Sequence, residues 1–139
     1  MTITILGLGP GDPADLTQRA RDLLFTAEEV YLRTVRHPTV AALPNHLARH
    51  SFDDLYETLD GFDAVYEAIA ECVVALGRRP QGVLYAVPGH PLVGESSVTR
   101  ILSAARLEGQ KVHIVGGLSF VEPALSLLGI DGLLLSLIH

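Results

Sequence analysis

The stretch that most constrains the fold of this chain runs from Val83 to Ser97. It begins with the apolar run Val83–Val87, whose β-branched and aromatic residues are typical of a buried strand. Pro88-Gly89-His90-Pro91 ends this strand, because two prolines around a glycine force the chain to turn. A helical pattern of apolar residues follows Gly94. A strand, a stiff loop and a helix in this order build ligand sites at the carboxyl edge of parallel sheets.

The rest of the chain repeats this alternation of strands and helices. Short apolar runs are separated by apolar residues at helical spacing, an order that predicts a doubly wound α/β protein. The composition agrees, because 48% hydrophobic residues suit a sheet that is covered on both faces. We therefore expect a three-layer α/β/α domain with a five-stranded parallel sheet. Its strands are expected at Ile3–Leu8, Glu29–Arg33, within His46–Phe52, and at Val83–Val87 and Lys111–Val115.

Charge and cysteine content exclude several classes of function. The net charge is −6 and no basic cluster exceeds Arg78-Arg79, so a nucleic-acid partner is not expected. No apolar run reaches the roughly 18 residues of a membrane span, and the first residues lack the basic start of a signal peptide. The single cysteine, Cys72, cannot form an internal disulfide and fits a reducing compartment. We expect a cytoplasmic protein without a membrane partner.

The glycines after the first expected strand are compatible with a dinucleotide site, but the residues that follow them argue against one. Gly7-x-Gly9-x-Gly11 resembles the start of a G-x-G-x-x-G motif, but Asp12 stands where the motif continues. Asp12 and Asp15 would repel a pyrophosphate at the start of the following helix. A tight turn that is compatible with another ligand is the preferred interpretation.

The loop Pro88-Gly89-His90-Pro91 is the better candidate for a ligand site. Its prolines fix the backbone before a ligand arrives, so carbonyl and amide groups can be aimed without an ordering cost on binding. Such a loop suits a neutral, methyl-rich or zwitterionic ligand better than a phosphate. His90 is either a hydrogen-bonding group of this site or a solvent-facing turn residue.

Ser119 has two possible roles. Ser119-Phe120-Val121-Glu122 has the spacing of a capping box, which predicts a helix with Val121, Leu125 and Leu128 facing inward. The alternative is that the Ser119 hydroxyl faces a ligand. Nucleophilic catalysis is not expected, because no G-x-S-x-G motif occurs. No metal site is expected either, because the pair His46 and His50 lacks further ligands.

Three motifs together resemble a known family. Gly-Leu-Gly-Pro-Gly-Asp-Pro at 7–13, Tyr-Ala-Val-Pro-Gly-His-Pro-Leu-Val at 85–93 and Val-Gly-Gly-Leu-Ser at 115–119 occur in the order and spacing of the tetrapyrrole (corrin/porphyrin) methylases. The chain resembles the amino-terminal domain of that family. It is most similar to the subgroup in which this domain precedes a nucleoside triphosphate pyrophosphohydrolase domain, which shares the Pro-Gly-His-Pro form and Leu-Arg-Thr at 32–34.

The resemblance implies a methyltransferase that uses S-adenosylmethionine and acts on a small molecule such as a tetrapyrrole. It implies the strand order 3-2-4-1-5 and a cofactor folded in a cleft between two α/β domains. The alternative function is a non-catalytic ligand-sensing or interaction module attached to the pyrophosphohydrolase. The residues that the resemblance assigns to the cofactor are Pro10, Pro88, Gly89, His90, Val93, Ser119 and Phe120.

Two positions depart from the family pattern. His90 stands where these methylases have the aspartate of Gly-Asp-Pro, and Arg33 stands where several of them place a proposed proton acceptor. The resemblance therefore assigns no catalytic residue, and transfer by this fragment is not expected.

The end of the chain yields a prediction about domains. Residues 1–128 are expected to form the amino-terminal domain, and residues 129–139 are expected to be the remnant of a truncated second one. The apolar segment Leu133–His139 is expected to be a strand without a partner of its own. It would dock on its own domain, pair across a homodimer or be disordered, and a homodimer is the expected assembly.

Overall fold

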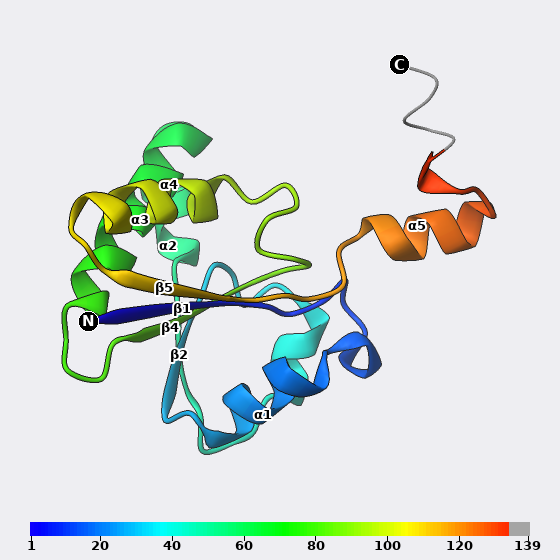
Figure 1. Ribbon diagram of the computed structural model, residues 1–139, viewed down its shortest axis with the longest axis horizontal. Helices are drawn as coiled ribbons and strands as arrows, with labels where there is room; N and C mark the ends of the chain where they lie inside the picture. The colour runs from blue at the N-terminus through cyan, green and yellow to red at the C-terminus, as the bar shows by residue number, and fades with distance from the viewer. Residues whose placement is uncertain (134–139) are drawn as a thin grey trace.

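The computed structural model describes residues 1–133 and shows a parallel sheet with helices on both faces (Figure 1). The sheet has five strands in the order β3-β2-β4-β1-β5, which confirms the predicted architecture and strand order. The strands are β1 (Thr2–Gly7), β2 (Glu29–Leu32), β3 (Ala48–Ser51), β4 (Val83–Val87) and β5 (Lys111–Val115). The α-helices are α1 (Gln18–Thr26), α2 (Asp53–Thr58), α3 (Phe62–Gly77), α4 (Ser96–Leu107) and α5 (Val121–Leu128), and 3-10 turns lie at Pro13–Asp15 and Pro38–Ala42.

Each face of the sheet has its own apolar core. The helices α3 and α4 cover one face, and α1 covers the other (Figure 1). Because side chains alternate along a strand, Ile3 and Ile5 of β1 point to the first core while Leu6 points to the second. In the middle strand β4, Tyr85 points to the first core and Ala86 to the second, and both are fully buried. Burial on both faces explains why the central strands are almost continuously apolar.

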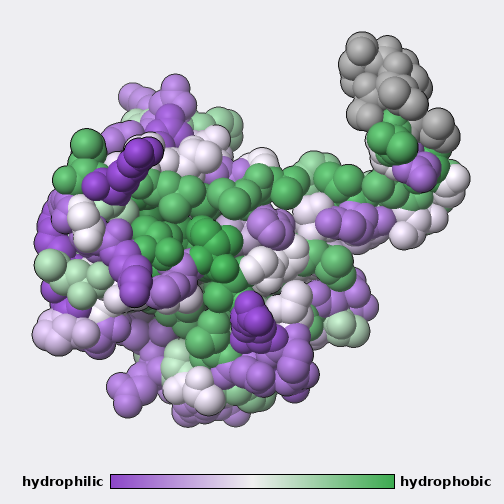
Figure 2. Space-filling view, viewed as in Figure 1, coloured by the Kyte–Doolittle hydropathy of each residue, from purple (hydrophilic) through white to green (hydrophobic). Residues whose placement is uncertain are grey.

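The last described helix differs from the sequence-based prediction. α5 projects from the body of the domain (Figure 1), and its side chains were expected to face inward. Instead Val121 is 38% exposed and Leu128 is 68% exposed, while Leu125 is only partly buried. The prediction was wrong because helical spacing indicates an apolar face without indicating what covers it. Figure 2 shows apolar surface continuing from the body along this projecting segment.

Within residues 1–133, no helix combines the length and apolar character that crossing a bilayer requires. The strand expected at Leu133–His139 falls almost entirely on residues 134–139, which lie outside the described part of the chain.

Candidate cofactor site at the carboxyl edge of the sheet

The candidate site lies where β1 and β4, neighbours in the sheet, reach their carboxyl ends. The chain leaves β1 toward α1 on one face and leaves β4 toward α4 on the other. Adjacent strands whose connections depart in opposite directions leave a crevice at their carboxyl ends. This crevice is the place at which a doubly wound sheet binds ligands.

Glycines bring the loops at this edge into direct backbone contact. The amide of Gly9 donates to the Gly89 carbonyl at 3.2 Å, and the amide of Gly89 donates to the Gly9 carbonyl at 2.8 Å. Gly89 has φ +66°, which an L side chain rarely adopts. A Cβ on Gly117 would lie 2.6 Å from the Gly89 carbonyl oxygen, so the segment after β5 also approaches this crossing closely.

A cavity of about 230 Å³ opens beside this crossing. It gathers five of the seven residues that the sequence assigned to the cofactor, from three segments far apart in the chain. The residues that line it are Gly9, Pro10, Arg33, His37, Pro88, Gly89, Val93, Gly94, Glu95 and Phe120.

The other two predicted residues, His90 and Ser119, do not line this cavity. The Nδ1 atom of His90 accepts a hydrogen bond from the Leu92 amide at 3.0 Å, and the ring lies against Gly116. Ser119 is only 2% exposed and packs behind Gly89. Neither residue therefore forms part of the cavity wall.

Ser119 caps α5 in a way that differs slightly from the predicted capping box. Its hydroxyl oxygen accepts a hydrogen bond from the Val121 amide at 3.0 Å, and the hydroxyl donates to the Glu122 carboxylate. The helix begins at Val121 with Phe120 as its N-cap residue. The Ser119 hydroxyl therefore bonds the amide of the second residue after it, whereas a capping box would bond the amide of the third. The contact with Ser119 is also the largest cause of a lowered pKa of Glu122.

Replacing Ser119 with alanine is expected to destabilise the start of α5 by about 1 kcal/mol, because a buried cap is lost. Hydrogen–deuterium exchange of the α5 amides would measure this as faster exchange. Ser119→Asp is expected to stabilise the start of α5 less than aspartate usually does at a helix start, since a second carboxylate would face Glu122. Unchanged exchange in the alanine variant would contradict the capping role.

Sequence reasoning missed Glu95. Its carboxylate is 5% exposed and its Oε1 lies 3.2 Å from Nη1 of Arg33, which forms an ion pair across the cavity. Glu95 is the N-cap residue of α4 but makes no capping hydrogen bond with its side chain. Nothing in the sequence links it to Arg33, because their pairing depends on how β2 and β4 lie side by side.

Burial governs the ionisation of Glu95. Desolvation raises the pKa of its carboxyl group to about 7, and Arg33 and the Ser97 hydroxyl oppose this rise. The Ser97 hydroxyl is itself hydrogen-bonded to the hydroxyl of Tyr85 at 2.8 Å, inside the core. The site therefore contains an acid that titrates near neutral pH.

His37 is a second residue that sequence reasoning did not place here. Its Nδ1 accepts from the Thr39 amide at 3.3 Å, so its Nε2, 3.0 Å from the Gly9 carbonyl oxygen, is assigned as the donor. Burial lowers the pKa of His37, with Arg33 acting in the same direction. A neutral His37 thus holds the loop that carries Pro10.

A second cavity, of about 470 Å³, adjoins the first through Arg33. Three aromatic rings stand around it: Tyr56 contacts Phe62 and Tyr66 edge-to-face, each with centroids 6.4 Å apart, and Phe62 stacks on Tyr66 at 6.2 Å. Its full lining is Arg33, Thr34, Arg36, Asp53, Tyr56, Glu57, Phe62 and Tyr66.

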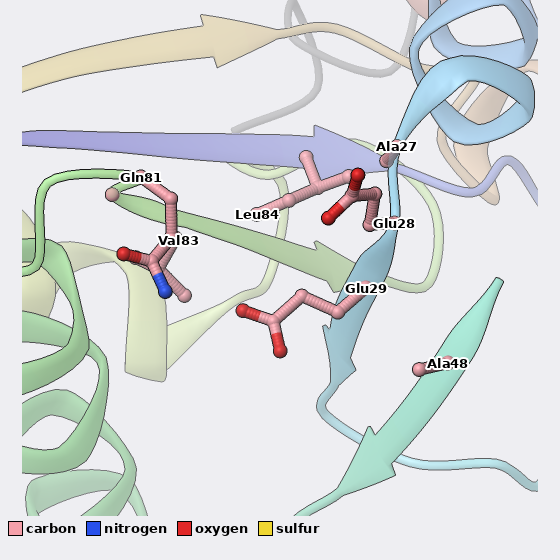
Figure 3. A pocket seen from close by; sticks show the side chains of 8 residues that line it. Ala27, Glu28, Glu29, Ala48, Gln81, Val83 and Leu84 are labelled. Carbon is pink, nitrogen blue, oxygen red and sulfur yellow. The ribbon is translucent and has the colours of Figure 1, made fainter.

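A larger cavity, of about 680 Å³, lies at the opposite edge of the sheet, where β2, β3 and β4 begin (Figure 3). Its Glu29 is already paired with Arg79 at 2.6 Å and lies 3.5 Å from His50. Parallel sheets bind ligands at the carboxyl edge, so we do not assign this cavity to the cofactor. No group of metal-ligating side chains gathers there or elsewhere within residues 1–133.

The fold and the crossed loops define a doubly wound α/β protein with its site at a topological switch point. Residues 2–132 match the family model of the Tetrapyrrole (Corrin/Porphyrin) Methylases. The chain belongs to this family.

Similar proteins agree with this assignment. Over 130 residues the chain is 41% identical to YabN of Bacillus subtilis (strain 168), an uncharacterised protein. The structure of uroporphyrin-III-C-methyltransferase from Thermus thermophilus superimposes with a TM-score of 0.66 at 27% identity, over 94% of this chain. Diphthine synthase shares the fold, with a TM-score of 0.65 at 20% identity over 94% of this chain and 50% of that chain.

The match covers only part of each relative. It spans 93% of this chain but 26% of YabN, and 53% of the Thermus thermophilus methyltransferase. A structure of uroporphyrin-III C-methyltransferase from Thermus thermophilus complexed with S-adenosyl homocysteine superimposes with a TM-score of 0.56 at 23% identity, over 86% of this chain and 49% of that chain.

Proposed function

We propose that this domain binds S-adenosylmethionine in the cavity beside the Gly9–Gly89 crossing and serves a methyltransferase. The observation that carries the proposal is the convergence of Pro10, Pro88, Gly89, Val93 and Phe120 on one cavity at the switch point. Membership of the methylase family supports it, as does the related structure with S-adenosyl homocysteine. When bound, the cofactor would supply an electrophilic methyl group.

The residues present fit such a ligand. Pro10, Pro88, Val93 and Phe120 offer apolar contacts, and the buried Glu95 carboxylate retains an oxygen without a hydrogen-bond partner in the described residues. The cavity, at about 230 Å³, is smaller than the roughly 300–1,000 Å³ of pockets that enclose a ligand. We infer that the remaining wall of the site comes from another part of the full-length protein.

The methyl acceptor is proposed to be a small planar molecule such as a tetrapyrrole. The adjoining cavity supports this, because its three aromatic rings offer stacking surfaces. Arg33 lines both cavities and so separates the proposed cofactor site from the proposed acceptor site.

Isothermal titration calorimetry of the full-length protein with S-adenosylmethionine and S-adenosyl homocysteine tests the cofactor assignment. We expect saturable binding of both ligands, and absence of binding for both would refute it. The alternative function, ligand sensing without transfer, would show binding without consumption of the cofactor. A methyl-transfer assay with a tetrapyrrole acceptor separates these two functions.

We further propose that the full-length protein is a cytoplasmic homodimer in which a pyrophosphohydrolase domain follows this one. In this proposal residues 1–128 form the present domain and residues 129–139 belong to the second α/β domain of the methylase-like part, which precedes the pyrophosphohydrolase domain. Support comes from the exposed apolar side chains at the end of the described chain, which a further domain or a second copy would cover. They include Leu127 at 89% exposure and Leu128 at 68%.

A further inference from the structure

The ion pair between Arg33 and Glu95 is incomplete on both sides. Glu95 Oε1 faces Nη1 of Arg33 at 3.2 Å, but Glu95 Oε2 is shielded from solvent and makes no hydrogen bond within residues 1–133. The Nε atom of Arg33 is equally shielded and equally without a partner in that part of the chain. One pair therefore offers a free acceptor and a free donor in the same cavity.

Such an arrangement is costly without a ligand. A buried polar atom that lacks a partner forfeits its hydrogen bonds to water, and charged groups forfeit the most. Most buried polar atoms in folded proteins are satisfied, so two adjacent exceptions at a cavity wall call for an explanation. No hydrogen bond of the described residues reaches Glu95 Oε2: the Ser97 hydroxyl, which also favours the ionised form of Glu95, lies 2.8 Å from the Tyr85 hydroxyl, and His37 is bonded to Gly9 and Thr39.

We propose that the Arg33–Glu95 pair binds the amino-acid end of S-adenosylmethionine, with Glu95 Oε2 accepting from the ammonium group and Arg33 Nε donating to the carboxylate. This inference rests on the proposed cofactor site. A zwitterion carries one cationic donor and one anionic acceptor, which complement the two unpartnered atoms of the pair. A purely anionic ligand would leave the Glu95 oxygen unpaired, and a purely cationic ligand would leave the Arg33 nitrogen unpaired.

The test compares three ligands with the full-length protein and its Glu95→Gln variant by calorimetry. S-Adenosylmethionine and S-adenosyl homocysteine both carry the amino-acid end, whereas 5′-methylthioadenosine lacks it. We expect Glu95→Gln to weaken the first two by a similar factor, roughly tenfold to a hundredfold, and to leave 5′-methylthioadenosine unchanged. Glu108→Gln is the matched control, because it also removes a carboxylate from an arginine pair, with Arg78, outside this cavity.

Each other result overturns the inference. If the variant binds all three ligands more weakly by the same factor, Glu95 has a structural role. If it binds all three as tightly as the unmodified protein does, Glu95 does not contact the ligand. Weakening of S-adenosylmethionine alone would indicate contact with its sulfonium group instead. If the unmodified protein binds none of the three ligands, the proposed cofactor function itself fails.

A second variant guards against a loss of folding, because Glu95→Gln leaves the partly buried Arg33 with a weaker partner. Arg33→Met combined with Glu95→Leu removes both charges, and such replacement of a buried pair is often neutral or stabilising. We expect this double variant to unfold at the same temperature as the original protein or higher. It should nevertheless lose affinity for both ligands that carry the amino-acid end, and retained affinity would refute the inference.

Discussion

Gly7→Ala is expected to lower the stability of the carboxyl edge by about 3 kcal/mol, at the upper end of the cost of overpacking. A Cβ on Gly7 would lie 3.0 Å from the Gly117 amide nitrogen and closer still to the Gly89 carbonyl oxygen. These neighbours are backbone atoms, which cannot rotate away as a side chain can. The variant should also lose cofactor binding, because the Gly9–Gly89 hydrogen bonds depend on the same approach.

Hydrogen–deuterium exchange in the full-length protein measures this effect locally, on the amides of β1 and β4. Gly116→Ala is a matched control at the same edge, because its Cβ would meet only the His90 ring, 3.1 Å from Nε2. A ring at the end of a side chain can shift, so a much smaller effect is expected. Equal protection in Gly7→Ala and the unmodified protein would show that the crossing is looser than described.

A change from about pH 6 to about pH 8 is expected to raise the affinity for S-adenosyl homocysteine roughly tenfold. The pKa of Glu95 is about 7, so its ionised fraction rises from roughly one-tenth to roughly nine-tenths over this interval, and only the ionised form attracts an ammonium group. The other groups facing Glu95 keep their charge state: Arg33 stays cationic, His37 has a lowered pKa, and the pKa values of Tyr56 and Tyr85 are raised.

Calorimetric titrations across this pH range provide the measurement, with Glu95→Gln as the reference for the ligand's own ionisation. Stability without ligand should show the opposite trend. The pKa of Glu95 lies above its ordinary value of 4.5, so the folded protein binds this proton more tightly and its stability falls as pH rises from about 4.5 to about 7. An identical pH dependence of affinity in Glu95→Gln would exclude Glu95 as the titrating group.

Much of the fold could be predicted because its signals are local. The apolar run at Val83–Val87, the prolines after it and the helical spacing beyond Gly94 each reflect the conformational preference of a short segment. The prediction for α5 failed because the contacts that bury a helix are not local. The strand order itself came from the family resemblance, since periodicity does not determine which strands pair.

The candidate site divides in the same way. Pro10, Pro88, Gly89, Val93 and Phe120 could be found because motif positions carry over along the chain, and these residues do line one cavity. Glu95 and His37 could not, because their significance lies in contacts with Arg33 and Gly9, which the fold brings near. A glutamate at a helix start is usually explained by its interaction with the helix dipole. That local explanation gives no reason to expect a buried partner elsewhere in the chain.

The pairing of β1 with β4 has a consequence for how the protein acquires its shape on the ribosome. Ile3 pairs with Val83, which is synthesised 80 positions later. At the usual rate of translation, β1 waits roughly 4–16 seconds for this partner. Closing so long a loop carries an entropic cost before any sheet contact is gained, so folding is expected to be slow for a chain of this size. Throughout that wait the nascent chain exposes an apolar strand, for which chaperones and neighbouring chains compete.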